Sequence, residues 1–210
     1  MSFKEIPLMK TSEGTVLFHP YISKNSLNKV KQVLSGRWIG QGPLVDKFEE
    51  RFKKMFTRNN YTLSTGSGTD ALHLSYILAG LKKGDEVIAP LFTCTATNIP
   101  FLYMGVKIKF ADIEPTTMNI SIESVKKLVN KKTKAIICMH YGGLPCDLDE
   151  LKKICNNYKI PLIEDAAHAL GATGVHLTSK QFDEIKEAKK LNLYTIISCH
   201  TFHDIEKALN

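Results

Sequence analysis

The chain has 210 residues, of which 43% are hydrophobic and 23% charged, so it is long and apolar enough to bury the core of one large domain. Its net charge of +7 comes from Lys and Arg residues that are scattered, which favours a solvated surface over a nucleic-acid-binding stripe. Residues 1–10 carry charges and a proline where a signal peptide would be apolar, and no apolar run could span a bilayer, so we expect a cytoplasmic protein that binds neither membrane nor nucleic acid.

The cysteines point in the same direction. There are five of them, an odd number, and none forms a CxxC pair. This pattern favours a reducing compartment and argues against a disulfide framework or a zinc site, so no metal ligands are predicted. The five are Cys94, Cys138, Cys146, Cys155 and Cys199.

Taken in order, the elements begin with two amphipathic helices, one over 25–34 and one opened by Pro43. Short apolar strands then alternate with helices. The predicted strands are 61–64, 86–89, 107–113, 135–140 and 160–164. The predicted helices are 69–79, 97–104, 122–129 and 147–157, the last two capped by Ser121 and Asp147. This alternation predicts an α/β fold of three layers, with a mainly parallel sheet and helices on both faces.

Ligands of such sheets bind at the carboxyl ends of the strands. The polar residues that follow the predicted strands are therefore the first candidates for a site. They are Thr93, His140, Tyr141, Asp165 and His168.

A Gly-rich turn precedes the helix predicted over 69–79. Gly68, Thr69 and Asp70 lie where backbone N–H groups at a helix N-terminus could bind a phosphate. An ordinary strand-to-helix turn has the same composition and is the commoner interpretation of the turn taken alone. The turn is neither a Walker loop, because no Gly-Lys-Ser/Thr follows, nor a dinucleotide fingerprint, because the third glycine is missing.

Asp165 follows an apolar strand and could keep a pyridine nitrogen protonated, which a pyridoxal phosphate (PLP) site requires. A helix-capping or solvent-facing aspartate is the alternative. His168 lies on the same loop and could contact the cofactor or be structural, and Phe92 could lie against the cofactor ring or be core.

In their joint order and spacing, several segments resemble the DegT/DnrJ/EryC1/StrS family of sugar aminotransferases, which are fold-type I PLP enzymes. The resemblance covers about Trp38 to Ala172. The matching segments are GRWIGQGP (36–43), GSGTDALHL (66–74), GDEVI (84–88), FTCTATN (92–98), FADI (110–113), KAII (134–137), HYGGLPCD (140–147) and EDAAH (164–168).

By that resemblance the large domain would bind PLP, with the backbone at Gly68, Thr69 and Asp70 on the phosphate and Asp165 on the pyridine nitrogen. His168 would lie near the cofactor with Phe92 against its ring, and the substrate would be met by Trp38, Gln41 and His140. The resemblance implies transfer of an amino group, usually from glutamate, to a keto group of a nucleotide-linked sugar. It also implies a homodimer with active sites shared between subunits.

Two departures from the family are visible. Cys94 stands where members often carry an aromatic ring-stacker, and neither the Schiff-base lysine nor the small C-terminal domain is identified after Ala172. We therefore expect residues 1–172 to form an incomplete large domain and 173–210 a tail of separate origin. None of the tail lysines has a setting that lowers a lysine pKa. They are Lys180, Lys186, Lys189, Lys190 and Lys207.

The tail is predicted as a strand, a helix over 181–190 and a strand over 194–200, and it weakly resembles a thiamine-phosphate-synthase-type (TenI-like) fragment. A divergent segment of the aminotransferase family is the alternative. For the whole chain, the sequence leaves open an active sugar aminotransferase, a catalytically inactive fragment that retains cofactor or partner binding, and a dinucleotide- or phosphosugar-binding module.

Overall fold

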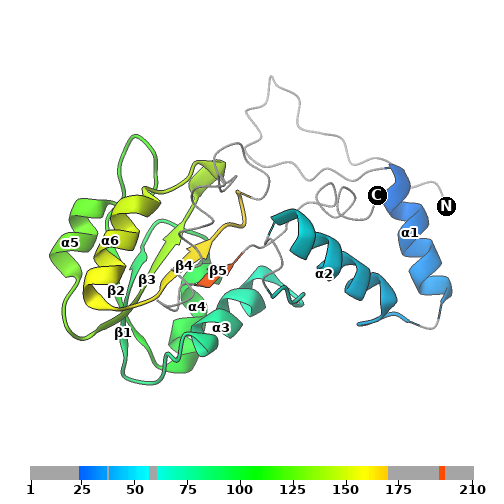
Figure 1. The fold of residues 1–210 in the computed structure, drawn as a ribbon, viewed down its shortest axis with the longest axis horizontal. Helices are drawn as coiled ribbons and strands as arrows, with labels where there is room; N and C mark the ends of the chain where they lie inside the picture. Colours follow the sequence, from blue (N-terminus) through cyan, green and yellow to red (C-terminus); the bar gives the residue numbers. More distant parts are fainter. Residues whose placement is uncertain (1–23, 37, 57–60, 170–193, 197–210) are drawn as a thin grey trace.

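The computed structural model describes residues 24–36, 38–56, 61–169 and 194–196. Its centre is a five-stranded, wholly parallel sheet with the strand order β2-β1-β3-β4-β5 (Figure 1). The strands are β1 (Glu86–Pro90), β2 (Lys107–Ala111), β3 (Thr133–Met139), β4 (Leu162–Asp165) and β5 (Tyr194–Ile196). The predicted parallel sheet is thus confirmed.

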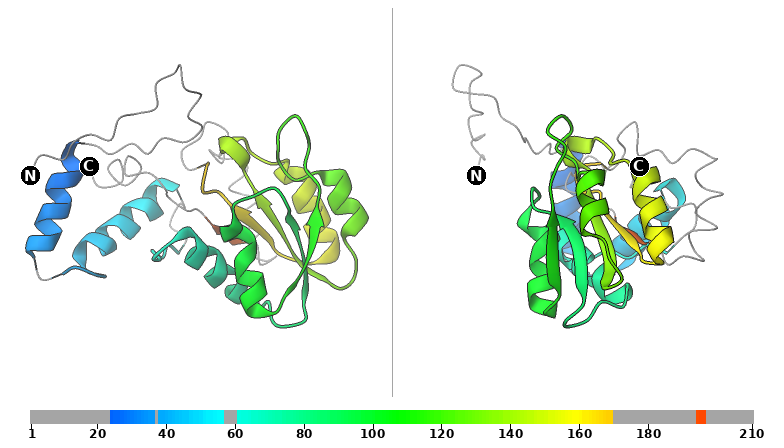
Figure 2. Two further views of the ribbon diagram at one scale, coloured as in Figure 1. Left: turned by 180° about the vertical axis from the view of Figure 1, so that it is seen from behind. Right: turned by 90° about the vertical axis from the view of Figure 1, so that its left-hand side faces the viewer.

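Helices cover both faces of this sheet, as the sequence predicts (Figures 1 and 2). One face packs against α3 (Gly68–Leu78) and α4 (Thr95–Met104), and the other against α5 (Ile122–Leu128) and α6 (Leu148–Tyr158). Alternate residues of each strand supply the two cores, because successive side chains of a strand point to opposite faces. Ile137 belongs to the α3/α4 core and its neighbour Cys138 to the α5/α6 core.

The central strand shows why the sheet forms where it does. Every residue of β3 except Lys134 is buried, which matches a strand covered on both faces. The edge strand β2 leaves Lys107 and Phe110 exposed. The strand with the longest apolar run, residues 135–139, therefore takes the middle of the sheet.

Side-chain caps fix the starts of the helices. Ser121 Oγ accepts the Ser124 N–H at 3.4 Å, and Asp147 Oδ1 accepts the Glu150 N–H at 3.1 Å, so both predicted caps are confirmed. A glycine ends α4: Gly105 follows its last residue with a φ of 68°. A Cβ there would come within 3.0 Å of Lys83 Cγ, so both the backbone and the space favour glycine.

The predicted strand 61–64 is wrong. Residues 61–65 run in irregular backbone outside the sheet, and Tyr61 is fully exposed. The Ser64 N–H does not pair with a neighbouring strand. It donates a hydrogen bond to Glu49 Oε1, at 2.6 Å, on helix α2 (Pro43–Phe56). The segment has strand-like composition but no strand edge beside it, and strands form only with a partner.

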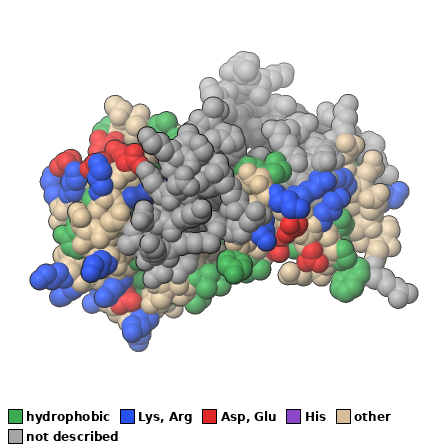
Figure 3. All heavy atoms as spheres, viewed as in Figure 1, with side chains coloured by type: hydrophobic (Ala, Val, Ile, Leu, Met, Phe, Trp, Pro, Cys, Tyr) green, Lys and Arg blue, Asp and Glu red, His purple; other side chains and the backbone are tan. Residues whose placement is uncertain are grey.

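Helices α1 (Lys24–Ser35) and α2 confirm the two predicted N-terminal helices and extend away from the sheet (Figure 1). The face in Figure 3 shows Lys and Arg mixed with Asp and Glu over α2 and over α5 and α6, without a continuous basic stripe. Among the described residues, no helix is long and apolar enough to cross a membrane. Of the predicted tail, the structure describes only Tyr194–Ile196, which pairs with β4 as a strand.

Candidate functional site

The carboxyl ends of β1, β3 and β4, which are neighbours in the sheet, bring together side chains from three loops. The rings of Phe92 and Tyr141 lie 5.0 Å apart, centroid to centroid. Tyr141 in turn meets His168 edge-on at 6.0 Å. Three of the residues expected near a ligand therefore form one aromatic row, at the edge of the sheet where α/β proteins bind their ligands.

Asp165 is the last residue of β4, and its side chain is buried, with 3% of the residue exposed. Its Oδ2 accepts the Thr97 hydroxyl at 2.7 Å, and its Oδ1 accepts the Ala167 N–H at 3.2 Å. Because a carboxylate offers about four lone-pair positions, Asp165 can accept a further donor. The alternative of a solvent-facing aspartate is excluded by this burial.

A chain of hydroxyl groups supports the carboxylate. Thr97 gives its only proton to Asp165, so the Thr93 hydroxyl, 2.7 Å away, must donate to Thr97 Oγ1. The Tyr76 hydroxyl donates to the Thr97 carbonyl oxygen at 2.8 Å. Tyr76 lies on α3, Thr97 on α4 and Asp165 on β4, so three elements are joined at one point.

Tyr76 is held in its neutral form. Burial raises the pKa of its hydroxyl far above the ordinary value, and the charge of Asp165 raises it further. The ring stacks on Phe101 with centroids 4.1 Å apart. The phenol therefore acts only as a donor and spacer, and it fixes α3 relative to α4.

His168 is half-buried and oriented by the backbone. Its Nδ1 accepts the Gly142 N–H at 3.3 Å, which leaves Nε2 as the ring nitrogen that can donate. Gly142 has a φ of 60°, in the short turn Tyr141–Gly143. His168 can thus present a donor at the same edge of the sheet as Asp165.

The predicted phosphate-binding turn forms the N-terminus of α3. Ser67 Oγ caps the helix by accepting the Asp70 N–H at 3.1 Å. No described residue accepts a hydrogen bond from the N–H groups of Gly68 and Thr69, which are half-buried first residues of the helix. These two donors, together with the positive end of the helix dipole, suit an anion. The Asp70 N–H, by contrast, is engaged by Ser67.

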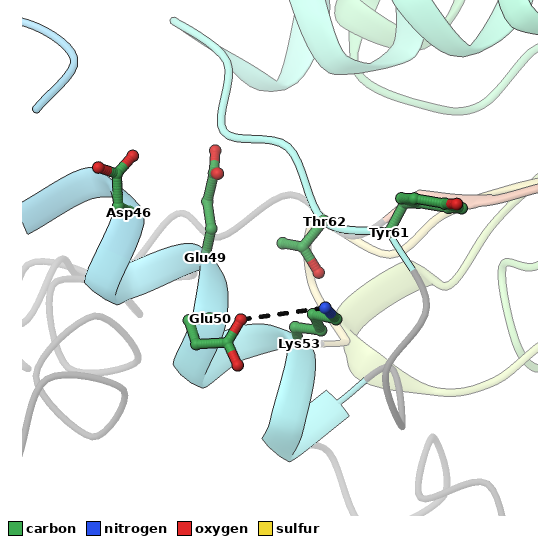
Figure 4. Close-up of a pocket in the computed structure, with 6 residues that line it drawn as sticks. All are labelled: Asp46, Glu49, Glu50, Lys53, Tyr61 and Thr62. Atoms are coloured by element: carbon green, nitrogen blue, oxygen red, sulfur yellow. Dashed lines mark ion pairs between the residues drawn. The ribbon is translucent and has the colours of Figure 1, made fainter. Parts of the chain in front are cut away.

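Trp38 and Gln41 lie exposed in the turn before α2, where Gly42 packs beneath the Trp38 side chain. None of the described hydrogen bonds or ring contacts joins them to Asp165 or His168. Beside α2 the structure has a cavity of about 210 Å³ (Figure 4). Asp46, Glu49 and Glu50 line it against a single cation, Lys53, so its net charge is negative and unsuited to a phosphate group.

His140 is fully buried on the other side of the strand ends. Its Nε2 lies 3.2 Å from Glu164 Oε2, and its Nδ1 accepts the Cys146 N–H at 3.1 Å. Glu164 and Asp165 thus point to opposite faces of the sheet, as strand alternation predicts. In this structure His140 has no surface that a substrate could reach. The tail lysines all lie outside the described residues.

Sequence reasoning missed Thr97 and Tyr76. Thr97 is a buried polar residue in the otherwise apolar face of α4, four residues after Thr93, and this spacing was the available signal. Tyr76 gave no signal, because a tyrosine on an amphipathic helix is usually core. Phe92, which sequence left open between core and ring contact, is 41% exposed and therefore not core.

These groups fit PLP in their chemistry. A phosphate would meet the Gly68 and Thr69 N–H groups, and a pyridinium N–H would find spare acceptor capacity on the buried carboxylate of Asp165. Phe92, Tyr141 and His168 provide ring faces and a donor at the same edge. The fold and these groups agree with the large-domain type of a PLP-dependent aminotransferase.

Comparison with known proteins agrees with this class. The model of the DegT/DnrJ/EryC1/StrS aminotransferase family matches residues 20–204. An uncharacterized protein of Methanocaldococcus jannaschii is 41% identical over 74% of this chain and 40% of its own length. The GDP-perosamine synthase of Vibrio cholerae is 34% identical over 74% of this chain and 42% of its own length. The structure of NtdA from Bacillus subtilis with bound cofactor PMP superposes with a TM-score of 0.68 at 29% identity, covering 76% of this chain and 37% of that one.

The chain belongs to the DegT/DnrJ/EryC1/StrS aminotransferase family, whose members use PLP and act on nucleotide sugars. It spans about 40% of the length of the curated relatives it matches. The expected TenI-like origin of the tail is not supported, because the family match continues through residue 204.

Proposed function

We propose that this chain binds PLP and serves in amino transfer to the keto group of a nucleotide-linked sugar, with glutamate as the amino donor. The observation that carries the proposal is the buried Asp165 carboxylate, held at the end of β4 by the Thr97 hydroxyl and the Ala167 N–H. Family membership supports the class of substrate.

When bound, PLP supplies an electron sink that stabilises negative charge on the substrate carbon. The chain's own residues would bind and orient it. Gly68 and Thr69 would donate backbone N–H groups to the phosphate, and Asp165 would hold a proton at the pyridine nitrogen. Phe92 would lie against the ring, and His168 would donate from Nε2 to a ring oxygen.

The remaining roles rest on the family pattern. Trp38 and Gln41 would meet the substrate from their exposed turn, in a homodimer that shares its active sites. His140, the third residue expected at the substrate, has no exposed ring surface, so we propose no substrate contact for it. The lysine that bonds covalently to the cofactor remains to be identified.

The test is a titration of the purified chain with PLP, followed by absorbance, with Asp165→Asn as the variant. Losing a hydrogen bond to a charged group should weaken binding by roughly 10- to 100-fold. Asp149→Asn, at an exposed carboxylate on α6, is the matched control and should bind as the parent does. Absence of saturable binding by the parent chain would refute the proposal.

Borohydride reduction of the PLP-loaded chain, followed by peptide mapping, separates the two remaining alternatives. A single modified lysine supports the enzyme and identifies the missing residue. Saturable binding without a modified lysine supports instead a domain that binds cofactor but has no turnover. Release of 2-oxoglutarate from glutamate by the loaded chain then tests the donor.

A further inference from the structure

Cys138, His140 and Cys146 form a compact cluster in the core, on the opposite face of the sheet from Asp165. One ligand atom from each residue, two thiol sulfurs and an imidazole nitrogen, can be chosen so that all lie within 4.8 Å of one another. All three residues are buried. We propose that this cluster is a binding site for a thiophilic divalent metal ion, Zn²⁺ being the ion its ligand set fits best.

The fold brings these ligands together from a short stretch of chain. Cys138 belongs to β3, His140 follows the end of that strand, and Cys146 returns after the turn Tyr141–Gly143. The Cys146 thiol donates to the Met139 carbonyl oxygen at 3.3 Å, which holds its sulfur over the strand end. The site is therefore built on a central strand and the turn that follows it.

The spacing of the ligand atoms suits zinc after a small contraction. With Zn–S near 2.3 Å and Zn–N near 2.0 Å, tetrahedral ligands are about 3.4–3.8 Å apart, so no two of the atoms, which now lie within 4.8 Å of one another, must approach by more than about 1.4 Å. The Met139 carbonyl oxygen now accepts the Cys146 thiol proton. It loses that donor when Cys146 becomes a thiolate, so it is an oxygen close to the metal that is open to coordination. Zinc would displace two thiol protons, and two thiolates would balance its charge, so the core gains no net charge.

Glu164 gives the imidazole the orientation that a metal ligand needs. Its Oε2 lies 3.2 Å from His140 Nε2, while Nδ1 accepts the Cys146 N–H, so the imidazole proton is on Nε2. A metal-bound histidine usually donates its other N–H to a carboxylate in this way. Binding at Nδ1 would exchange one backbone hydrogen bond for one coordination bond.

The test uses the full chain, stripped with a chelator under reducing conditions and then dialysed against Zn²⁺. We expect about one zinc retained per chain. Cys138→Ala and Cys146→Ala should each retain zinc at least about tenfold more weakly. Cys155→Ala is the matched control, because Cys155 is equally buried in the same core but lies outside the ligand set, and it should bind zinc as the parent does.

A second measurement does not depend on variants that fold. Co²⁺ bound by the parent chain should give a thiolate-to-metal charge-transfer band and a tetrahedral visible spectrum. The proposal is overturned if the parent retains no zinc, if the two cysteine variants retain as much as the parent, or if cobalt gives no thiolate band. A metal-free parent chain with a Cys138–Cys146 disulfide would also overturn it.

Discussion

The Thr97 hydroxyl donates to the Asp165 carboxylate at 2.7 Å, and both groups are buried. This bond orients the carboxylate from α4, while β4 supplies its backbone. Thr97 also receives the Thr93 hydroxyl and, through its carbonyl oxygen, the Tyr76 hydroxyl. One threonine thus connects the strand that carries Asp165 with α3, whose N-terminus is the proposed phosphate site.

Thr97→Val removes this hydroxyl while keeping the shape of the side chain. The Asp165 carboxylate and the Thr93 hydroxyl each lose a partner, so the free energy of unfolding should fall by about 1–3 kcal/mol. Affinity for PLP should fall as well. Chemical denaturation and a PLP titration measure the two effects. Thr97→Ser retains the hydroxyl and should keep most of the affinity, and a Val variant that binds PLP like the parent would contradict this role.

Ser67→Ala removes the cap of α3, so the first turn of the helix, which carries the Gly68 and Thr69 N–H groups, should fray. We expect a loss of about 0.5–2 kcal/mol in stability, together with weaker binding of PLP and of inorganic phosphate. Ser121→Ala is the matched control, because Ser121 caps α5 on the opposite face of the sheet. It should lower stability without changing phosphate affinity. Equal effects of both variants on phosphate binding would speak against the α3 site.

Tyr76→Phe keeps the stacking on Phe101 and removes only the hydroxyl that donates to the Thr97 carbonyl. We expect a loss of about 1 kcal/mol in the free energy of unfolding. If Tyr76 also holds α3 against α4, hydrogen exchange at the first turn of α4 should accelerate. An unchanged denaturation curve would show that the bond contributes nothing.

Glu86 should make the free energy of unfolding depend on pH in the acid range. Burial raises its pKa, but Lys109, 3.1 Å away, and Asn130, also at 3.1 Å, outweigh burial and lower the pKa overall. A lowered pKa in the folded state means that the carboxylate stabilises the fold above its unfolded pKa of about 4.3, and that this contribution disappears as the pH falls through the folded value.

The measurement is the free energy of unfolding of the parent and of Glu86→Gln at neutral pH and near about pH 3. The difference between the two proteins should be largest at neutral pH and should shrink in acid. Lys109→Met removes the partner and should reproduce the reduced acid dependence. A difference that stays constant with pH would rule out this ion pair as its source.

Much of the fold could be predicted from sequence because each buried strand carries its own apolar pattern. β3, which is apolar in nearly every position, was found within two residues of its start. The strand predicted over 61–64 failed because propensity does not say whether a partner strand lies alongside. The candidate site shows the same division: the sequence could single out Asp165 because it follows a strand, whereas its bond to Thr97 depends on how α4 packs against β4.

The cysteine cluster shows a different limit. The sequence argument against zinc relied on the absence of a CxxC pair, and the spacing of Cys138, His140 and Cys146 matches no common zinc signature. The three side chains meet only because the chain reverses after β3, through Gly142 with its positive φ. The spacing of the three residues along the sequence does not predict that reversal.

The order β2-β1-β3-β4-β5 also determines how the protein reaches its native state. Every pair of neighbouring strands is parallel and joins segments separated by about 20 residues or more, because a crossover must intervene. Contacts of such long range form late and slowly. The edge that carries Phe92, Tyr141 and Asp165 exists only after β1, β3 and β4 have all paired. In a refolding experiment, binding of the cofactor would therefore begin only when the sheet is complete. Collapsed species that form earlier should not bind it.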